Sequence, residues 1–246
     1  EMCIRDRGRL LYDHVSEAFE ALNEGEEKLK RSIELGVGQL KIGVSSTLCK
    51  YMLLPYLKEF IHRNPHISIS IECQSTNETL KLLDDDKIDI GLIGKPASLK
   101  TFNFYYLDNI EDIFVTTKDY LRNLSARGVK KSEILQNSTL MLLDKGNMTR
   151  KYIDDYLQEN QIHVKDSIDI SNMDLLIDFA KIGVGVACVI KSIVSKELAD
   201  GTLIEIPLGI PIHKREVGFA YKESSKLSTS LQTFIKFYES YTPDDF

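Results

Sequence analysis

Apolar and polar residues follow one another along this chain in a pattern that occurs twice, with an offset of about 100 residues. Each copy contains three short apolar runs, separated by segments with the spacing of amphipathic helices. The runs occupy residues 40–44, 67–71, 89–93, 139–143, 167–170 and 186–190. Each copy predicts a strand–helix–strand–helix–strand unit with mainly parallel strands and right-handed crossovers. The pair predicts an α/β fold of two Rossmann-like lobes.

The remaining periodic segments predict further helices and the strands that join the lobes. Helices are expected at 47–63, 77–85, 147–160, 173–182, 192–199 and 227–241, and strands at 113–117, 202–206 and 215–221. Strands 113–117 and 215–221 would carry the chain from one lobe to the other and back. The last helix would pack on the first lobe. Lobe I is therefore expected at 37–113 plus 217–243, and lobe II at 114–216.

A long helix is expected before the first lobe, over residues 9–34. Its apolar or small residues follow a heptad-like rhythm that Gly25 interrupts, at Leu11, Val15, Ala18, Leu22 and Leu29. Such a helix could pack on its own domain or pair with a second copy. The second reading is favoured because the helix has no other apolar surface. Residues 8–36 are therefore expected to form a linker and dimerisation helix, ended by Gly36.

Composition limits the classes of protein that this chain can represent. Of its 246 residues, 43% are hydrophobic and 28% are charged, and the net charge is -6. An acidic chain is a poor candidate for binding nucleic acid directly, which requires a basic face. No apolar run reaches the roughly 18–20 residues of a membrane span, so no membrane partner is expected.

The cysteines are scattered, without a CxxC pair, so neither a metal site nor a redox motif is predicted. Cys73 and Cys188 lie in apolar strands and are expected to be buried thiols. The first seven residues, 1–7, resemble translated sequencing adapter and are expected to be foreign to the protein. The native chain would then extend upstream, and the default location is the cytoplasm.

Four predicted helices begin with Ser, Thr or Asn directly after a strand. One such cluster is explained by helix capping alone. Four clusters at the same topological position favour a ligand site, because helix starts offer free N–H groups and the positive end of the dipole. Gly94, at the end of the third strand, belongs to the same edge of the sheet. The candidate binding residues are Ser45, Ser46, Thr47, Ser75, Thr76, Gly94, Asn147 and Asn172.

Signatures of enzymes are weak or absent. The five histidines are dispersed, and no HExxH, GxSxG or P-loop pattern occurs. Gly183 and Gly185 resemble the start of a dinucleotide-binding motif, but they precede a strand instead of following one. Asp84–Asp86 lies at the end of a helix and is interpreted as a solvated surface. No catalytic residue, metal ion or cofactor is therefore predicted.

An ordered set of segments resembles the effector-binding part of LysR-type transcriptional regulators. The segments are Gly38–Gly43, Leu54–Pro55, Phe60–Pro65, Leu83–Leu92, Ile182–Val186 and Gly201–Leu203. The similarity extends from about residue 8 to residue 241. No single segment is decisive, but their order along the chain is specific.

The resemblance implies a two-lobed domain similar to type 2 periplasmic binding proteins. It also implies a winged helix-turn-helix for DNA binding, which is missing from this sequence, and a homodimer or homotetramer. In that family a Ser/Thr pair after the first strand contacts the effector, and Ser45 and Thr47 fit this pair, with Ser46 beside them. The resemblance thus implies a small anionic or zwitterionic effector between the lobes, whose binding alters DNA binding.

Two other classes of protein have the same two-lobed fold. A solute-binding protein of a transporter would use the same cleft, but it needs a signal peptide or lipid anchor and does not need the heptad-like helix. An enzyme on the same scaffold, of prephenate dehydratase or porphobilinogen deaminase type, lacks support from any catalytic constellation.

Overall fold

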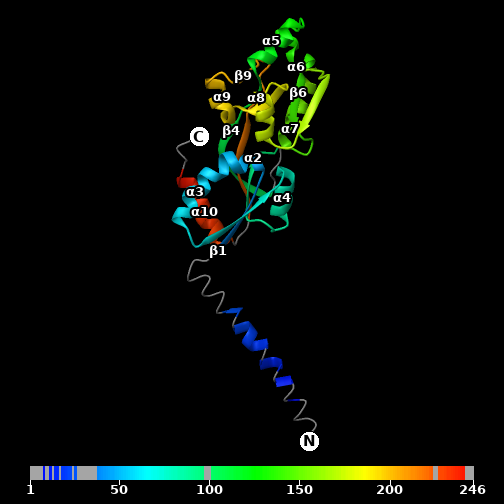
Figure 1. Cartoon of the computed structure of the whole chain (residues 1–246). Coiled ribbons are helices and arrows are strands. Elements are labelled where there is room, and N and C mark those ends of the chain that lie inside the picture. The colour runs from blue at the N-terminus through cyan, green and yellow to red at the C-terminus, as the bar shows by residue number, and fades with distance from the viewer. Residues whose placement is uncertain are drawn as a thin grey trace.

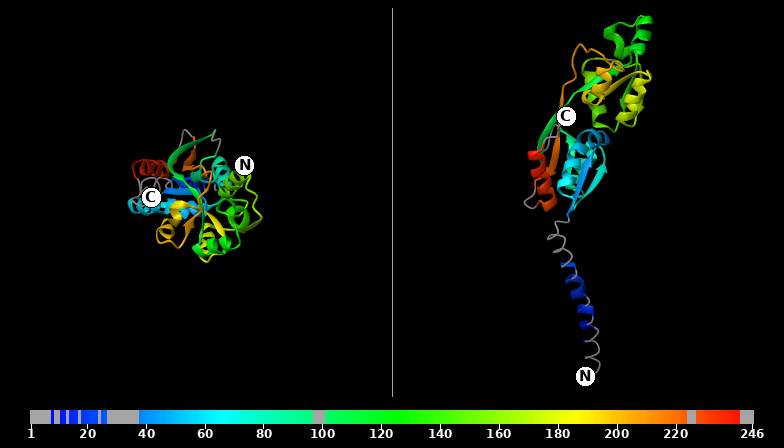
Figure 2. Two further views of the ribbon diagram at one scale, coloured as in Figure 1. Left: turned by 90° about the horizontal axis from the view of Figure 1, so that it is seen from above. Right: turned by 60° about the vertical axis from the view of Figure 1, so that its left-hand side comes forward.

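The computed structural model describes residues 38–96, 101–223 and 227–241, together with residues 8, 11, 12, 14–16, 18–23, 25 and 26. Two lobes lie one above the other, and the helical residues near the N-terminus stand apart from both (Figures 1 and 2). Each lobe is built on one five-stranded mixed sheet with helices packed on it. The predicted α/β fold of two lobes is therefore confirmed.

The first sheet has the strand order β2-β1-β3-β10-β4. Its strands are β1 (Gly38–Val44), β2 (Ile67–Cys73), β3 (Ile90–Gly94), β4 (Phe102–Ile110) and β10 (Arg215–Lys222). β1 is parallel to β2 and β3, whereas β10 is antiparallel to β3 and β4. Its helices are α2 (Ser46–Leu48), α3 (Leu54–Arg63), α4 (Thr76–Asp84) and α10 (Thr229–Ser240).

The second sheet has the order β7-β6-β8-β5-β9. Its strands are β5 (Asp112–Thr116), β6 (Thr139–Leu143), β7 (Asp166–Ile170), β8 (Val186–Ile190) and β9 (Ile204–Glu205). Its helices are α5 (Lys118–Ala126), α6 (Ile134–Asn137), α7 (Met148–Glu159), α8 (Met173–Lys181) and α9 (Ser195–Ala199). Short 3-10 turns occur at Lys131–Glu133 and Lys191–Val194.

The internal repeat predicted from the sequence is visible in the strand order. The parallel trio β2-β1-β3 of the first sheet corresponds to β7-β6-β8 of the second. In each sheet an antiparallel strand follows the trio: β10 in the first and β5 in the second. The chain passes between the sheets at Glu111, between β4 and β5, and returns between β9 and β10. Two connections therefore join the lobes.

Aromatic packing holds α10 against the first sheet. Phe219 of β10 stacks on Tyr238 of α10 with ring centroids 4.6 Å apart, and Phe60 of α3 meets Phe234 edge-on at 4.9 Å. All four rings are buried, and each burial contributes about 1.5–3 kcal/mol of hydrophobic stabilisation. The predicted return of the last helix to the first lobe is confirmed.

The helix predicted at 47–63 is interrupted. It consists of α2, a π-helical turn at Cys49–Leu53 and α3. Pro55 lies in the first turn of α3. Because proline has no N–H, it cannot donate to the carbonyl four residues earlier, and the backbone takes the wider π turn there.

Two further predictions were wrong in detail. Cys73 is exposed and not buried, because it ends β2, the edge strand of its sheet. The strand predicted at 202–206 is shortened to β9, Ile204–Glu205. Cys188 is buried, as expected.

The described residues before position 27 are helical, and their apolar side chains are exposed. Leu11, Val15 and Leu22 of the predicted heptad-like rhythm are 66%, 46% and 69% exposed. These side chains therefore do not pack on the lobes of their own chain. Residues 1–7, Leu29 and Gly36 lie outside the described residues. No helix among the described residues combines the length and the hydropathy needed to cross a bilayer.

Candidate functional site

A cleft of about 810 Å³ lies between the two lobes and brings together most of the predicted binding residues. Its walls come from both sheets and from the return connection into β10, and α2, α4 and α7 begin near the junction of the lobes (Figure 1). The predicted residues that line the cleft are Ser45, Thr47, Ser75, Thr76, Gly94 and Asn147. Ser46 and Asn172 do not line it.

The first-lobe wall carries two helix caps. The Ser45 hydroxyl oxygen accepts from the Leu48 N–H, and the Ser75 hydroxyl oxygen accepts from the Glu78 N–H, both at 3.3 Å. A capping hydroxyl still has its own hydrogen to donate to a ligand. Capping and ligand binding are therefore compatible at these two residues.

The second-lobe wall is the first turn of α7. Asn147 caps this helix, and its Oδ1 atom accepts from the Thr149 N–H at 2.8 Å. Thr149, Lys151 and Tyr152 line the cleft behind it. The starts of α4 and α7 thus both contribute to the cleft, where their free N–H groups favour negative charge.

Cationic side chains also line the cleft, and none of them was predicted from the sequence. Lys95, Lys151, Lys214 and Arg215 are among its residues, against the carboxylates Asp155 and Glu216. They come from the ends of β3 and β10 and from α7, which are distant in the sequence. No local motif joins them, so only the assembled fold reveals a basic lining.

Arg215 is held in place by a buried carboxylate. Its Nε and Nη2 atoms donate to the Asp112 carboxylate at 2.8 and 2.9 Å, and its guanidinium lies over the Tyr152 ring at 5.1 Å. Burial raises the pKa of Asp112, and the Arg215 charge opposes that shift. Arg215 also donates to Thr149 Oγ1 at 3.3 Å, which ties the return strand to α7.

Lys151 differs from the other cations of the cleft because its side chain has no partner among the described residues. Lys95 pairs with Glu216, and Lys214 lies 3.0 Å from Glu111. The side chain of Lys151 forms no ion pair or hydrogen bond with any other residue that the structure describes. Its exposed ammonium group is therefore available to a ligand in the cleft.

Asn172 belongs to a different contact between the lobes. It caps α8 by accepting from the Leu175 N–H at 2.9 Å. In the first turn of that helix, Asp174 Oδ1 lies 2.7 Å from Lys50 Nζ and 2.5 Å from the Tyr51 hydroxyl. These hydrogen bonds lower the pKa of Asp174. The start of α8 thus contacts the first lobe directly instead of lining the cleft.

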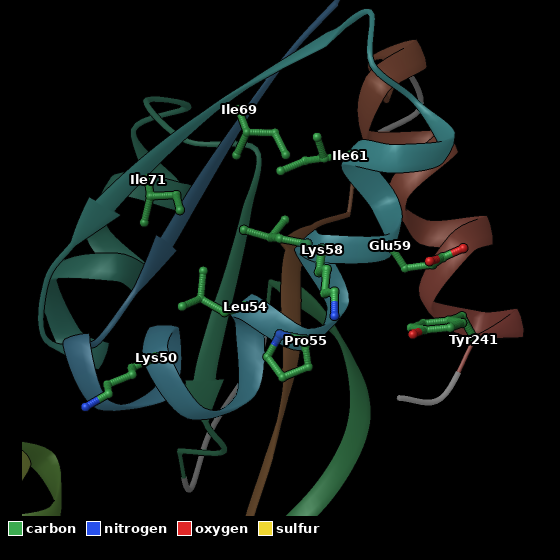
Figure 3. A pocket seen from close by; sticks show the side chains of 10 residues that line it. Lys50, Leu54, Pro55, Lys58, Glu59, Ile61, Ile69, Ile71 and Tyr241 are labelled. Atoms are coloured by element: carbon green, nitrogen blue, oxygen red, sulfur yellow. The ribbon is translucent and has the colours of Figure 1, made fainter. Parts of the chain in front are cut away.

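A second hollow of about 800 Å³ lies on the outer face of α3 and β2 (Figure 3). Leu54, Ile61, Ile69 and Ile71 form its apolar floor, and Lys58 lies at its rim. None of the predicted binding residues lines it. Aliphatic side chains make up much of this lining, whereas hydroxyl, amide and charged side chains make up most of the lining of the cleft between the lobes.

Within the described part of the chain, no group of three or more His, Cys, Asp or Glu side chains could hold a metal ion. The described residues that line the cleft include neither histidine nor cysteine. Hydroxyl, amide and cationic side chains line the cleft, and these groups are suited to binding a polar molecule through hydrogen bonds and charge.

The LysR substrate binding domain family matches residues 34–242. Among curated proteins, the uncharacterized HTH-type transcriptional regulator YeiE of Escherichia coli K12 is 23% identical over 96% of this chain and 78% of its own length. The transcriptional activator CmpR of Synechocystis is 24% identical over 95% of this chain and 76% of its own length. These relatives are transcriptional regulators.

Solved structures show the same fold. The regulatory domain of Synechocystis CcmR in complex with 2-PG is 19% identical and has a TM-score of 0.68, covering 81% of this chain and 95% of that one. The regulatory domain of HypT from Salmonella typhimurium is 16% identical with the same TM-score, covering 81% and 93%. These matches give the transporter alternative no support. The chain belongs to the LysR substrate binding domain family, as the effector-binding domain of a LysR-type transcriptional regulator.

Proposed function

We propose that the effector is a small anionic or zwitterionic metabolite and that it binds in the cleft between the lobes. The observation that carries this proposal is the cationic lining, in which Lys151 has no protein partner among the described residues. The starts of α4 and α7 add partial positive charge at the same place. A carboxylate, phosphate or sulfate group would satisfy these donors.

Ligands of solved relatives agree with this chemistry. The CcmR regulatory domain holds 2-PG, the QuiR effector-binding domain holds shikimate, and the OxyR2 regulatory domain holds sulfate. Sulfate and shikimate are anions. The predicted residues Ser45, Thr47, Ser75, Thr76, Gly94 and Asn147 would complete the site as uncharged donors and close contacts.

Effector binding would act by changing the angle between the lobes. The two connections at Glu111 and 206–214 and the Lys50–Asp174 contact restrain that angle. A ligand that contacts both walls binds the closed arrangement more tightly and so shifts the population towards it. In the complete cytoplasmic regulator, this change would reposition DNA-binding domains joined to the N-terminal side of helix 8–36.

We further propose that the regulator is a homodimer or homotetramer, with helix 8–36 as linker and dimerisation element. The exposed apolar side chains of that helix and the apolar hollow on α3 and β2 support self-association. Lobe I would comprise 37–113 plus 217–243, and lobe II 114–216. The sheet membership of β4, β5 and β10 supports this division to within two residues, because β5 of the second sheet begins at Asp112 and β10 of the first sheet begins at Arg215.

Replacing Lys151 tests the site. Thermal unfolding would be followed with sulfate, phosphate, shikimate, amino acids and neutral sugars as ligands, and affinities would be measured by calorimetry. We expect anions to stabilise the chain and sugars not to. The Lys151→Gln variant should bind the best anion at least about tenfold more weakly, because a charge-assisted hydrogen bond contributes about 1.5–3 kcal/mol.

The matched control is Lys236→Gln, which removes an exposed charge from α10, outside the cleft. It should leave the affinity unchanged. Equal affinities for the wild type and Lys151→Gln would contradict the assignment of Lys151. Stabilisation by neutral sugars alone would contradict the anionic effector.

A further inference from the structure

Two cysteines lie near the carboxyl ends of the neighbouring strands β1 and β2, Cys73 at the end of β2 and Cys49 after the short helix that follows β1. Cys73 is the last residue of β2 and is in register with Val44, the last residue of β1. The two segments stay joined directly after these residues, because the Gln74 N–H donates to the Val44 carbonyl at 2.9 Å. Cys49 begins the π-helical turn that follows α2, and its N–H donates to the Ser45 carbonyl at 2.8 Å. The fold thus brings together two thiols that are separated in the sequence.

The two thiols interact, but they differ in exposure. Cys49 is half-buried and Cys73 is exposed, and neither is in a disulfide. Burial and the neighbouring Cys73 thiol both raise the pKa of Cys49. Cys188 provides a contrast within the same chain, because it is buried in the second lobe and burial raises its pKa strongly.

We propose that Cys49 and Cys73 form a thiol-based redox site, which a hydroperoxide converts reversibly into an intramolecular disulfide. The exposed Cys73 sulfur attacks the peroxide, which yields a sulfenic acid and releases one molecule of water or alcohol. The Cys49 sulfur then attacks the sulfenic sulfur, and the sulfenic oxygen leaves as one molecule of water. Two thiols are oxidised and one peroxide is reduced. A dithiol reductant restores both thiols by exchange.

The disulfide would restrain one wall of the cleft. Cys49 follows the segment Ser45–Leu48, and Cys73 precedes Ser75 and Thr76, which line the cleft from the neighbouring turn. A bond between the sulfurs would tie these two turns together across the ends of β1 and β2. The π-helical turn at Cys49–Leu53 is the segment whose backbone would be held most directly, and such turns are frequent at functional sites.

Peptide mapping by mass spectrometry tests the disulfide. The reduced chain would be treated with hydrogen peroxide, blocked with a thiol-alkylating reagent, digested without reductant and analysed. We expect one linked pair of peptides, Cys49 with Cys73, that has lost two hydrogens and that dithiothreitol separates. Cys188 should be recovered alkylated after denaturation. Intermolecular links at Cys73, or sulfinic acid at Cys73 without a link to Cys49, would overturn the proposal.

Two single variants test the order of the steps without needing the disulfide. In Cys49→Ser, Cys73 should stop at the sulfenic acid and be trapped by dimedone. In Cys73→Ser, Cys49 should remain a thiol under the same treatment. Cys188→Ser is the matched control and should form the link as the wild type does. Equal trapping at Cys49 in the Cys73→Ser variant would contradict the assignment of Cys73 as the attacking thiol.

Hydrogen exchange tests the restraint of the wall and does not depend on the identity of the effector. Oxidation should slow amide exchange by at least about threefold in peptides that cover 44–53 and 74–79, and reduction should reverse it. Peptides of the second lobe serve as the internal reference. A disulfide that forms without any change in exchange at 44–53 would contradict the restraint.

Discussion

At the scale of single residues, replacing the buried carboxylate of Asp112 should lower the stability, because Arg215 would lose its counter-charge. Asp112 is 2% exposed and bonded to Arg215 through both oxygens. The Asp112→Asn variant leaves the Arg215 charge largely buried without its counter-charge, which costs about 3 kcal/mol. The free energy of unfolding in urea measures this loss.

The control for this substitution is Asp85→Asn, which breaks an exposed pair with Lys87. Its effect should stay within about 0.5 kcal/mol. An Asp112→Asn variant as stable as the wild type would show that the buried pair does not hold β5 and β10 together.

The uncharged residues of the cleft could be predicted from the sequence, whereas the charged ones could not. Ser45, Thr47 and Ser75 were predictable because their position after a strand and before a helix is visible locally. Lys151 and Arg215 were not, because their neighbours come from elements far apart in the chain. The contact between Cys49 and Cys73 was missed for the same reason, since spacing identifies only cysteines that are close in sequence.

At the scale of elements, the periodicity predicted where helices and strands lie better than where they are interrupted. The strands of both parallel trios and the helices α4, α7, α8 and α10 lie where the pattern placed them. The helix at 47–63 has a π-helical turn because Pro55 lacks an N–H, and periodicity does not report that loss. Cys73 is exposed because β2 is an edge strand, which depends on the order of strands in the sheet.

Capping by Ser75 should contribute to the stability of α4. Its hydroxyl oxygen accepts from the Glu78 N–H at the start of the helix. The Ser75→Ala variant should lower the free energy of unfolding by about 1 kcal/mol, because that N–H loses its partner. Chemical denaturation gives the value.

Ser46→Ala is the comparison for this prediction, because Ser46 is an exposed first residue of α2 and caps no helix with its side chain. It should change the stability by less than about 0.5 kcal/mol. Equal effects of the two substitutions would mean that the Ser75 hydroxyl does not act as a cap.

At the scale of the whole molecule, the repeat predicted two lobes and a cleft, and the fold confirms both lobes. The way the lobes touch could not be predicted. Lys50 and Asp174 are 124 positions apart and meet only when both helices that carry them are in place. The sequence pattern predicted that the start of α8 contacts the ligand. In the structure, the start of α8 contacts the first lobe instead.

The contact between the lobes should depend on pH through Asp174. Lys50 and Tyr51 lower the pKa of Asp174 below its ordinary value of 3.8. A carboxylate whose folded pKa is depressed stabilises the folded protein above its unfolded pKa, and this contribution is lost as pH falls through the folded value. The difference in unfolding free energy between the wild type and Asp174→Asn should therefore be constant near neutral pH. It should become smaller as the pH falls below 3.8.

Asp178→Asn, on the same helix, is the reference for this pH series. Asp178 forms a long ion pair with Lys181, at 3.9 Å, and among the described residues it forms no ion pair with the first lobe. Its difference from the wild type should remain close to zero throughout. If the difference in unfolding free energy between the wild type and Asp174→Asn does not become smaller below pH 3.8, the carboxylate does not join the lobes.

The proposed function depends on a small anion binding between the lobes of this effector-binding domain. A crystal structure grown with the anion that most stabilises the chain shows directly where that anion binds. We expect electron density in the cleft, in contact with Lys151 on α7 and with Ser75 on the opposite wall. Density for the anion in the hollow on α3 and β2, with none between the lobes, would contradict the proposed site.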